Sequence, residues 1–167
     1  MMDVLRAIEA SGVSVWVRES GSIWSYPTII FFHSAGLAII VGLSMAIDLR
    51  VLGVARGLPV APMERLFPIM WFGFWVNAIS GLLLTMADAP AMLTSRLFLF
   101  KMAVIGVGLI TMAALRRALR LPVPQGERMP LAAQATAVAS LLLWTGAIAA
   151  GRLTAYFGPG AEIKGIQ

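Results

Sequence analysis

Among its 167 residues, this chain has no cysteine and a single histidine. Without cysteine there is no disulfide, iron–sulfur cluster, thiolate zinc site or thioether-attached haem. Charged residues make up only 13% of the chain and hydrophobic residues 59%, which lies outside the range of soluble globular domains. The sequence therefore predicts one compact membrane domain.

Catalytic motifs are also missing. The chain has no Walker-type glycine loop, nucleophile elbow, zinc-protease helix or pair of catalytic carboxylates. Its ten methionines are scattered, whereas a Cu(I) pathway favours a closely spaced cluster. The net charge of +5 comes mostly from arginines that flank apolar runs, a pattern that sets membrane topology and does not indicate nucleic-acid binding. An electron-transfer component is compatible with these absences, and a self-contained enzyme is not expected.

Four apolar runs are long enough to cross a bilayer as helices, for which about 20 residues suffice. Short connections between them predict an all-α fold, an integral-membrane up-down-up-down four-helix bundle. The bundle is expected to occupy residues 23–158, with helices at about 23–49, 67–86, 97–118 and 131–157. Residues 159–167 are expected to form a C-terminal tail.

Residues 1–22 are too mixed in character to span a membrane and too apolar to be a free tail. We interpret them as an amphipathic segment on the membrane surface, with Trp16, Trp24 and Tyr26 at headgroup depth. A soluble cap on the bundle is the alternative interpretation.

The arginines predict the orientation. The first and third connections lie on one side of the membrane and are rich in arginine, namely Arg50, Arg56, Arg65, Arg116, Arg117, Arg120 and Arg128. The other side holds Arg6, Arg18, Arg96 and Lys164 outside the expected spans. Because cytoplasmic loops carry the excess of positive charge, both termini are expected to be periplasmic.

The histidine, His33, lies in the first expected span. It follows Tyr26 by seven residues, or about 10 Å along a helix. An imidazole at this depth is unfavourable unless it is paired, ligated or next to water, so it marks a candidate site. Lys101 and Arg152 lie in the same outer half, and Tyr156 is one turn from Arg152. If these faces point inward, they form a polar pocket that opens near the periplasmic face.

The second span places Gly73, Asn77, Gly81 and Thr85 at intervals of four residues. They form one stripe of small and polar groups, the kind of surface on which membrane helices pack closely. Packing is the simpler interpretation. Asn77 is also placed to serve a buried cofactor or water.

A pocket with one imidazole and two cations suits a flat apolar ligand with an anionic edge. Haem b fits this description with His33 as an axial ligand, Lys101 and Arg152 near the propionates, and Met86, Met102 or another subunit as the second ligand. A quinone head group is the alternative cofactor. The predicted cofactor-binding residues are His33, Lys101, Arg152, Tyr156 and Asn77, and His33 is the one candidate metal ligand.

Purely structural interpretations stand beside these. His33 can be a neutral imidazole that is hydrogen-bonded to a neighbouring helix, while Lys101 and Arg152 reach the headgroups or pair with Asp88. Asp48 and Arg50, two residues apart, do not face each other on a helix. Each is expected to pair elsewhere, with Arg65, Arg116 or headgroups as candidates.

Several segments resemble a family of small bacterial four-helix membrane proteins described only as a domain of unknown function. They are SIWSYPTIIFFHSAGLAIIVGLSMAIDLRVLG (Ser22 to Gly53), ISGLLL (Ile79 to Leu84), the Phe100-Lys101 pair and AIAAGRLTAY (Ala147 to Tyr156). The resemblance implies the four-span fold and a bacterial inner membrane, without an activity. A more distant similarity, to copper-resistance D and cytochrome b561 type bundles, implies histidines that bind metal or haem.

These observations predict a small bacterial inner-membrane protein that lies in the lipid bilayer as a homo-oligomer or as a subunit of a membrane complex. The expected function is that of a haem b- or quinone-associated redox component. A non-catalytic scaffold or assembly subunit is the first alternative. A metal or proton conduit is the second.

Overall fold

The computed structural model describes residues 2–54, 56–124 and 127–157, and it is all-helical with no strand in these ranges. Short helices α1 and α2 come first, and α3 is the first long helix. The 3₁₀ helix η1 leads into α4, and the short helix α5 separates α4 from α6. The bounds are α1 Met2–Glu9, α2 Gly12–Glu19, α3 Tyr26–Val51, η1 Ala61–Leu66, α4 Phe67–Ala87, α5 Ala89–Thr94, α6 Arg96–Leu119 and α7 Leu131–Phe157.

Four helical stretches are long and apolar enough to cross a membrane, namely Tyr26–Val51, Ala61–Ala87, Arg96–Leu119 and Leu131–Leu153. Local sequence explains several of their ends. Pro27 and Pro68 lie in the first turns of α3 and α4, where a missing N–H leaves no hydrogen bond unmade. Ser95 caps α6 by accepting a hydrogen bond from the Phe98 amide at 3.4 Å. The chain turns after α3 at Gly53, whose positive φ of 98° favours glycine.

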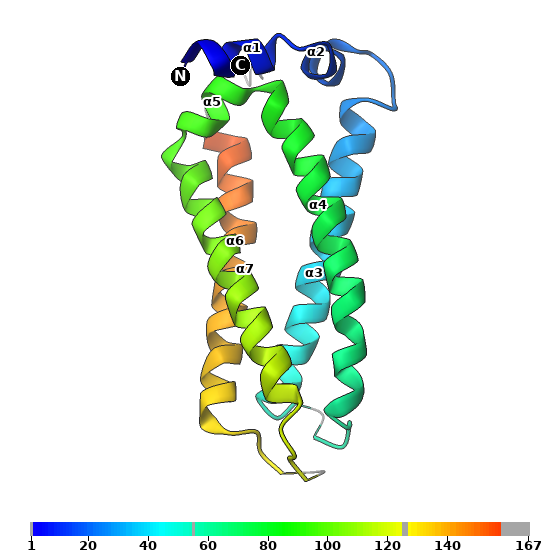
Figure 1. Cartoon of the computed structure of the whole chain (residues 1–167), viewed down its shortest axis with the longest axis vertical. Coiled ribbons are helices and arrows are strands. Elements are labelled where there is room, and N and C mark those ends of the chain that lie inside the picture. The colour runs from blue at the N-terminus through cyan, green and yellow to red at the C-terminus, as the bar shows by residue number, and fades with distance from the viewer. Residues whose placement is uncertain (1, 55, 125–126, 158–167) are drawn as a thin grey trace.

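The long helices pack as two pairs (Figure 1). Helix α3 lies along α4, α6 lies along α7, and α3 and α7 join the two pairs. Although α4 and α6 are consecutive long helices, they make little contact with each other in the described chain. The spatial order is therefore α4, α3, α7, α6, and side chains of α3 reach both α4 and α7.

The main core lies toward the η1 end of the bundle. It joins all four long helices through buried side chains that include Ile47, Val51, Phe67, Met112, Leu115 and Trp144. Many large apolar side chains on the same helices are exposed instead, including Phe31, Phe32, Phe72, Trp75, Ile79, Leu82, Leu99, Phe100, Ile110 and Leu142. Such an apolar outer surface is compatible with a membrane protein.

The two ends of the molecule differ. Helices α1, α2 and α5 lie together at one end, and η1 and the chain between α6 and α7 lie at the other (Figure 1). At the first end, a second small core of Val17, Ile29 and Ala87 joins α2 to the bundle. Arg18 Nη1 donates to the carbonyl oxygen of Ala87 at 3.0 Å.

At the opposite end, Arg116 and Arg120 both contact the Glu64 carboxylate of η1. This end carries most of the arginines. The expected C-terminal tail, residues 159–167, lies outside the described residues.

Candidate functional site

His33 lies in the seam between α3 and α4, where its side chain and backbone both bind Asn77. His33 Nδ1 is 2.9 Å from the Asn77 carbonyl oxygen, and Asn77 Nδ2 donates to the His33 carbonyl oxygen at 2.7 Å. Ser80 Oγ lies 3.3 Å from the same ring nitrogen. The imidazole is half-buried. One histidine and one asparagine therefore link the two helices through reciprocal hydrogen bonds.

These contacts select a tautomer. A carbonyl oxygen only accepts, so the short contact with the Asn77 oxygen requires a proton on His33 Nδ1. In the neutral ring, Nε2 then carries a lone pair and no proton. The structure gives Nε2 no hydrogen-bond partner within the described ranges. A backbone carbonyl on Nδ1 is also the arrangement that orients histidines for ligation through Nε2.

The small residues of α4 make this seam narrow. A methyl group on Gly36 of α3 would lie 2.6 Å from both the Asn77 nitrogen and the Gly73 oxygen, which are backbone atoms. A methyl group on Gly81 would lie 2.9 Å from Cε1 of His33. The stripe of Gly73, Asn77 and Gly81 thus meets α3, as its spacing predicted for a packing surface.

Lys101 lies near His33 but on the other helix pair. Its Nζ would be 3.8 Å from a methyl group on Gly151, so its side chain runs along α7. The ammonium is close enough to His33 for its charge to act on the imidazole. Two of the predicted site residues therefore share one electrostatic environment, and Asn77 is hydrogen-bonded within it.

Arg152 has a different position. Its side chain is exposed, and so is that of Thr145, which shares its face of α7. The face of α7 that packs on the core carries Ala137, Ser140 and Trp144 instead. Arg152 and Thr145 thus lie on a more exposed face of α7 than these residues, and the place of Arg152 in a pocket stays a prediction. The side chain of Tyr156 lies outside the described residues.

From the sequence, Asp48 and Arg50 were each expected to pair with a charged side chain or with lipid headgroups. In the structure, both residues have different surroundings. Arg50 is buried and donates to two backbone carbonyls, those of Leu58 at 2.7 Å and Arg56 at 3.1 Å. Asp48 is fully buried, and neither carboxyl oxygen has a hydrogen-bond partner among the described residues. Ser140 of α7 is its polar neighbour, outside hydrogen-bonding geometry. No sequence pattern distinguished Asp48 as buried, because its neighbour Arg50 suggests a membrane surface.

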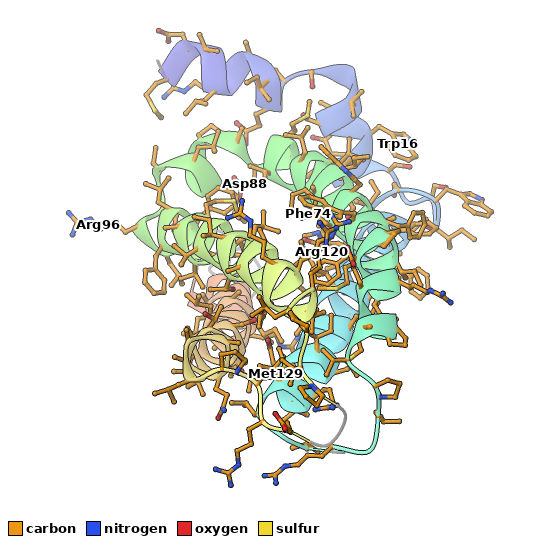
Figure 2. The ribbon with its side chains drawn as sticks, turned by 60° about the horizontal axis from the view of Figure 1, so that its bottom comes forward. Trp16, Phe74, Asp88, Arg96, Arg120 and Met129 are labelled. Atoms are coloured by element: carbon orange, nitrogen blue, oxygen red, sulfur yellow. The ribbon has the colours of Figure 1, made fainter. Side chains whose placement is uncertain are left out.

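The charged groups that act on Asp88 are Glu9 and Arg18. Asp88 lies between α4 and α5, where burial and then the nearby Glu9 carboxylate raise the pKa of its carboxyl, while Arg18 lowers it. Arg96, in the next helix, projects away from the bundle (Figure 2). The charged groups at this end thus belong to α1, α2 and the α4–α5 turn.

The space around the His33 ring is limited on the side of Gly81. Cε1 of His33 packs on Gly81, whereas a porphyrin bound at Nε2 would need open space on both sides of the ring. Met102, one candidate second haem ligand, is 41% exposed. Among the described residues there is no group of three or more histidine, cysteine, aspartate or glutamate side chains that could hold a metal ion. A groove of about 390 Å³ on α3 and α4 has an apolar lining of Ala38, Ile39, Gly42, Leu43 and Ile69.

The family resemblance suggested by the sequence segments finds no support outside the chain itself. Comparison with protein-family models, with curated proteins and with solved structures finds no match.

Proposed function

We propose that this chain is a multi-pass protein of the bacterial inner membrane, an up-down-up-down bundle with both termini periplasmic. Four apolar helices of membrane length and their apolar outer surface support insertion in a bilayer. The end that holds η1 carries Arg56, Arg65, Arg116, Arg117 and Arg120, and this excess supports a cytoplasmic position for it. Trp16 and Trp24, both exposed at the other end, suit the opposite headgroup layer.

Within this bundle, we propose that His33 and Lys101 bind the head group of a quinone, so that the protein is a redox component of the membrane. The observation that carries the proposal is the hydrogen bond from His33 Nδ1 to the Asn77 carbonyl oxygen. It leaves Nε2 as an acceptor for the hydroxyl of a reduced head group. The Lys101 ammonium, which acts on the same imidazole, favours an oxygen atom with negative charge nearby.

Each residue then has a definite task. Asn77 fixes the orientation and tautomer of His33, and Nε2 of His33 would accept a hydrogen bond from a hydroxyl of the reduced head group. Lys101 donates a hydrogen bond to an oxygen of the head group. A bound quinone would supply the electron transfer, and the side chains would bind and orient its head group. Haem b suits the site less well for two reasons. The chain offers only one strong axial ligand, His33, and the His33 imidazole packs on Gly81, which leaves little space beside it.

The test is extraction of the full chain, purified in mild detergent, with organic solvent. A quinone should be found in the wild type by chromatography and absorbance, and should be strongly reduced in His33→Ala and Lys101→Ala. Arg96→Ala is the matched control, since Arg96 projects away from the bundle on the same helix as Lys101. A visible haem absorption band that is lost in His33→Ala would show that the cofactor is haem and not a quinone. A colourless, quinone-free preparation would refute both cofactors.

A second candidate function is a non-catalytic scaffold or assembly subunit. The close approach of Gly36 to Gly73 and the reciprocal bonds between His33 and Asn77 favour it, since together they give His33 a role in helix packing. In that case His33→Ala should weaken the fold or an assembly and leave any extracted lipid unchanged. A metal or proton conduit through His33 would instead require altered ion uptake in liposomes by His33→Ala and Lys101→Ala.

A further inference from the structure

The strongest unexplained feature of the molecule is the Asp48 carboxyl. It is 0% exposed, lies in the apolar core between α3 and α7, and has no hydrogen bond on either oxygen among the described residues. An ionised carboxylate without partners in such an environment is strongly unfavourable. Burial of this kind therefore favours the neutral carboxylic acid.

Ser140 of α7 and, next to it, Ser44 of α3 place two hydroxyl groups near Asp48. Ser140 of α7 is the side chain that interacts with the carboxyl, and Ser140 Oγ lies 3.4 Å from Ser44 Oγ of α3. Both serines are buried. A protonated carboxyl can donate a hydrogen bond to a serine hydroxyl, because a hydroxyl oxygen accepts.

Among the described residues, no ion pair reaches the Asp48 carboxyl. Helices α4 and α7 carry no charged residue between Phe67 and Ala87 or between Leu131 and Gly151. On α3, Arg50 donates to the carbonyls of the following loop. On α6, Arg116 contacts Glu64, and Arg117 is exposed.

We propose that Asp48 is a proton-binding site in the interior of the bundle. The buried carboxyl holds one proton, and as the pH rises it releases this proton to water at the η1 end, leaving the carboxylate. Asp48 lies three residues before the end of α3, which is about 4.5 Å along the helix axis, so the path is short. A hard metal cation is a poorer occupant, because it takes about six oxygen ligands and this site offers two carboxyl and two hydroxyl oxygens.

Infrared spectroscopy of the full chain in a detergent without carbonyl groups tests this proposal, which is independent of any quinone at His33. Wild-type protein at neutral pH should show the carbonyl stretching band of a protonated carboxyl, which should be absent from Asp48→Asn and should decline at alkaline pH. Asp88→Asn is the control and should retain the band. Ser140→Ala should shift the band frequency without removing it, which a purely structural role for Ser140 would not produce.

Three results would overturn the proposal. They are a wild-type spectrum without the band at neutral pH, a band that persists in Asp48→Asn, and a band that sodium chloride abolishes while choline chloride does not. The last would assign the site to a cation. Because the wild-type pH series and Ser140→Ala need no change at Asp48, the test stands even if Asp48→Asn fails to fold.

Discussion

At the scale of single residues, the His33–Asn77 pair makes the most specific contact between two long helices. Its reciprocal geometry is that of a helix-to-helix polar clamp, in which each residue contacts the backbone of the other. The sequence identified both residues but not their partnership. Spacing shows which residues share a face of one helix, whereas the rotation of α3 against α4 depends on packing.

We expect His33→Ala and Asn77→Ala each to destabilise the bundle by about 1 to 2 kcal/mol, since hydrogen bonds between membrane helices have modest net strength. The double variant should lose about the sum of the two, because each side chain bonds the backbone carbonyl of the other residue and each single change removes only its own bond. Unfolding by sodium dodecyl sulfate in mixed micelles measures all three. Ser34→Ala, at an exposed position on α3, is the control. A double variant that loses far less than the sum would contradict this geometry and assign the stabilisation to the direct contact between Asn77 Nδ2 and His33 Nδ1.

Asp88 gives a pH dependence outside the long helices. Its pKa is raised in the folded protein by burial and by Glu9. The folded state thus holds this proton more tightly than the unfolded chain, and stability falls as the pH rises through the interval between the two pKa values. Asp88→Asn should raise the melting temperature at neutral pH. Its advantage should shrink as the pH falls toward the unperturbed aspartate pKa of about 3.9.

The control for Asp88 is Asp3→Asn, at an exposed position on α1. Thermal unfolding of the three proteins over a series of pH values measures the effect. A constant difference between Asp88→Asn and wild type at every pH would contradict the assignment to Asp88.

At the scale of elements, α3 and α4 approach each other closely because Gly36 and Gly73 have no side chains at the point where the helices cross. Gly36→Ala should destabilise the protein by about 1 to 3 kcal/mol, because overpacking forces the backbones apart. Its methyl group meets the backbone of Gly73 and Asn77, which cannot rotate away. Gly42→Ala, on the same helix with nothing within 4 Å, should be neutral or slightly stabilising. The same detergent titration distinguishes the two, and equal effects would argue against a close crossing in the bilayer.

The elements also show what the sequence could predict. Apolar run length and composition predicted an all-helical chain with four membrane-length helices, and this is confirmed. The spatial order α4, α3, α7, α6 and the exposed face of Arg152 were not accessible, because many rotations of apolar helices satisfy the same pattern. Asp48 was missed for the same reason. A carboxylate near a helix end resembles a surface residue until the neighbouring helix is placed over it.

At the scale of the whole molecule, the different arginine content of the two ends predicts the orientation in the membrane. The native chain has no cysteine, so single cysteines can report on each end without background labelling. Gly57 and Gly12 are suitable positions, since both are exposed and an added side chain meets nothing within 4 Å at either. They lie in the connection between α3 and η1 and at the start of α2, at opposite ends of the bundle.

In intact spheroplasts, we expect a membrane-impermeant maleimide to label Gly12→Cys and to leave Gly57→Cys unlabelled until the membrane is opened. The positive-inside rule requires this result if the end with η1, Arg116 and Arg120 is cytoplasmic. Labelling of Gly57→Cys alone would show that the bundle has the opposite orientation in the membrane. The proposed quinone site at His33 would then lie in the cytoplasmic half, and Asp48 would exchange its proton with the periplasm. Labelling of both positions in intact cells would be incompatible with a membrane-spanning α3, because the single crossing of α3 between Gly12 and Gly57 puts the two positions on opposite sides.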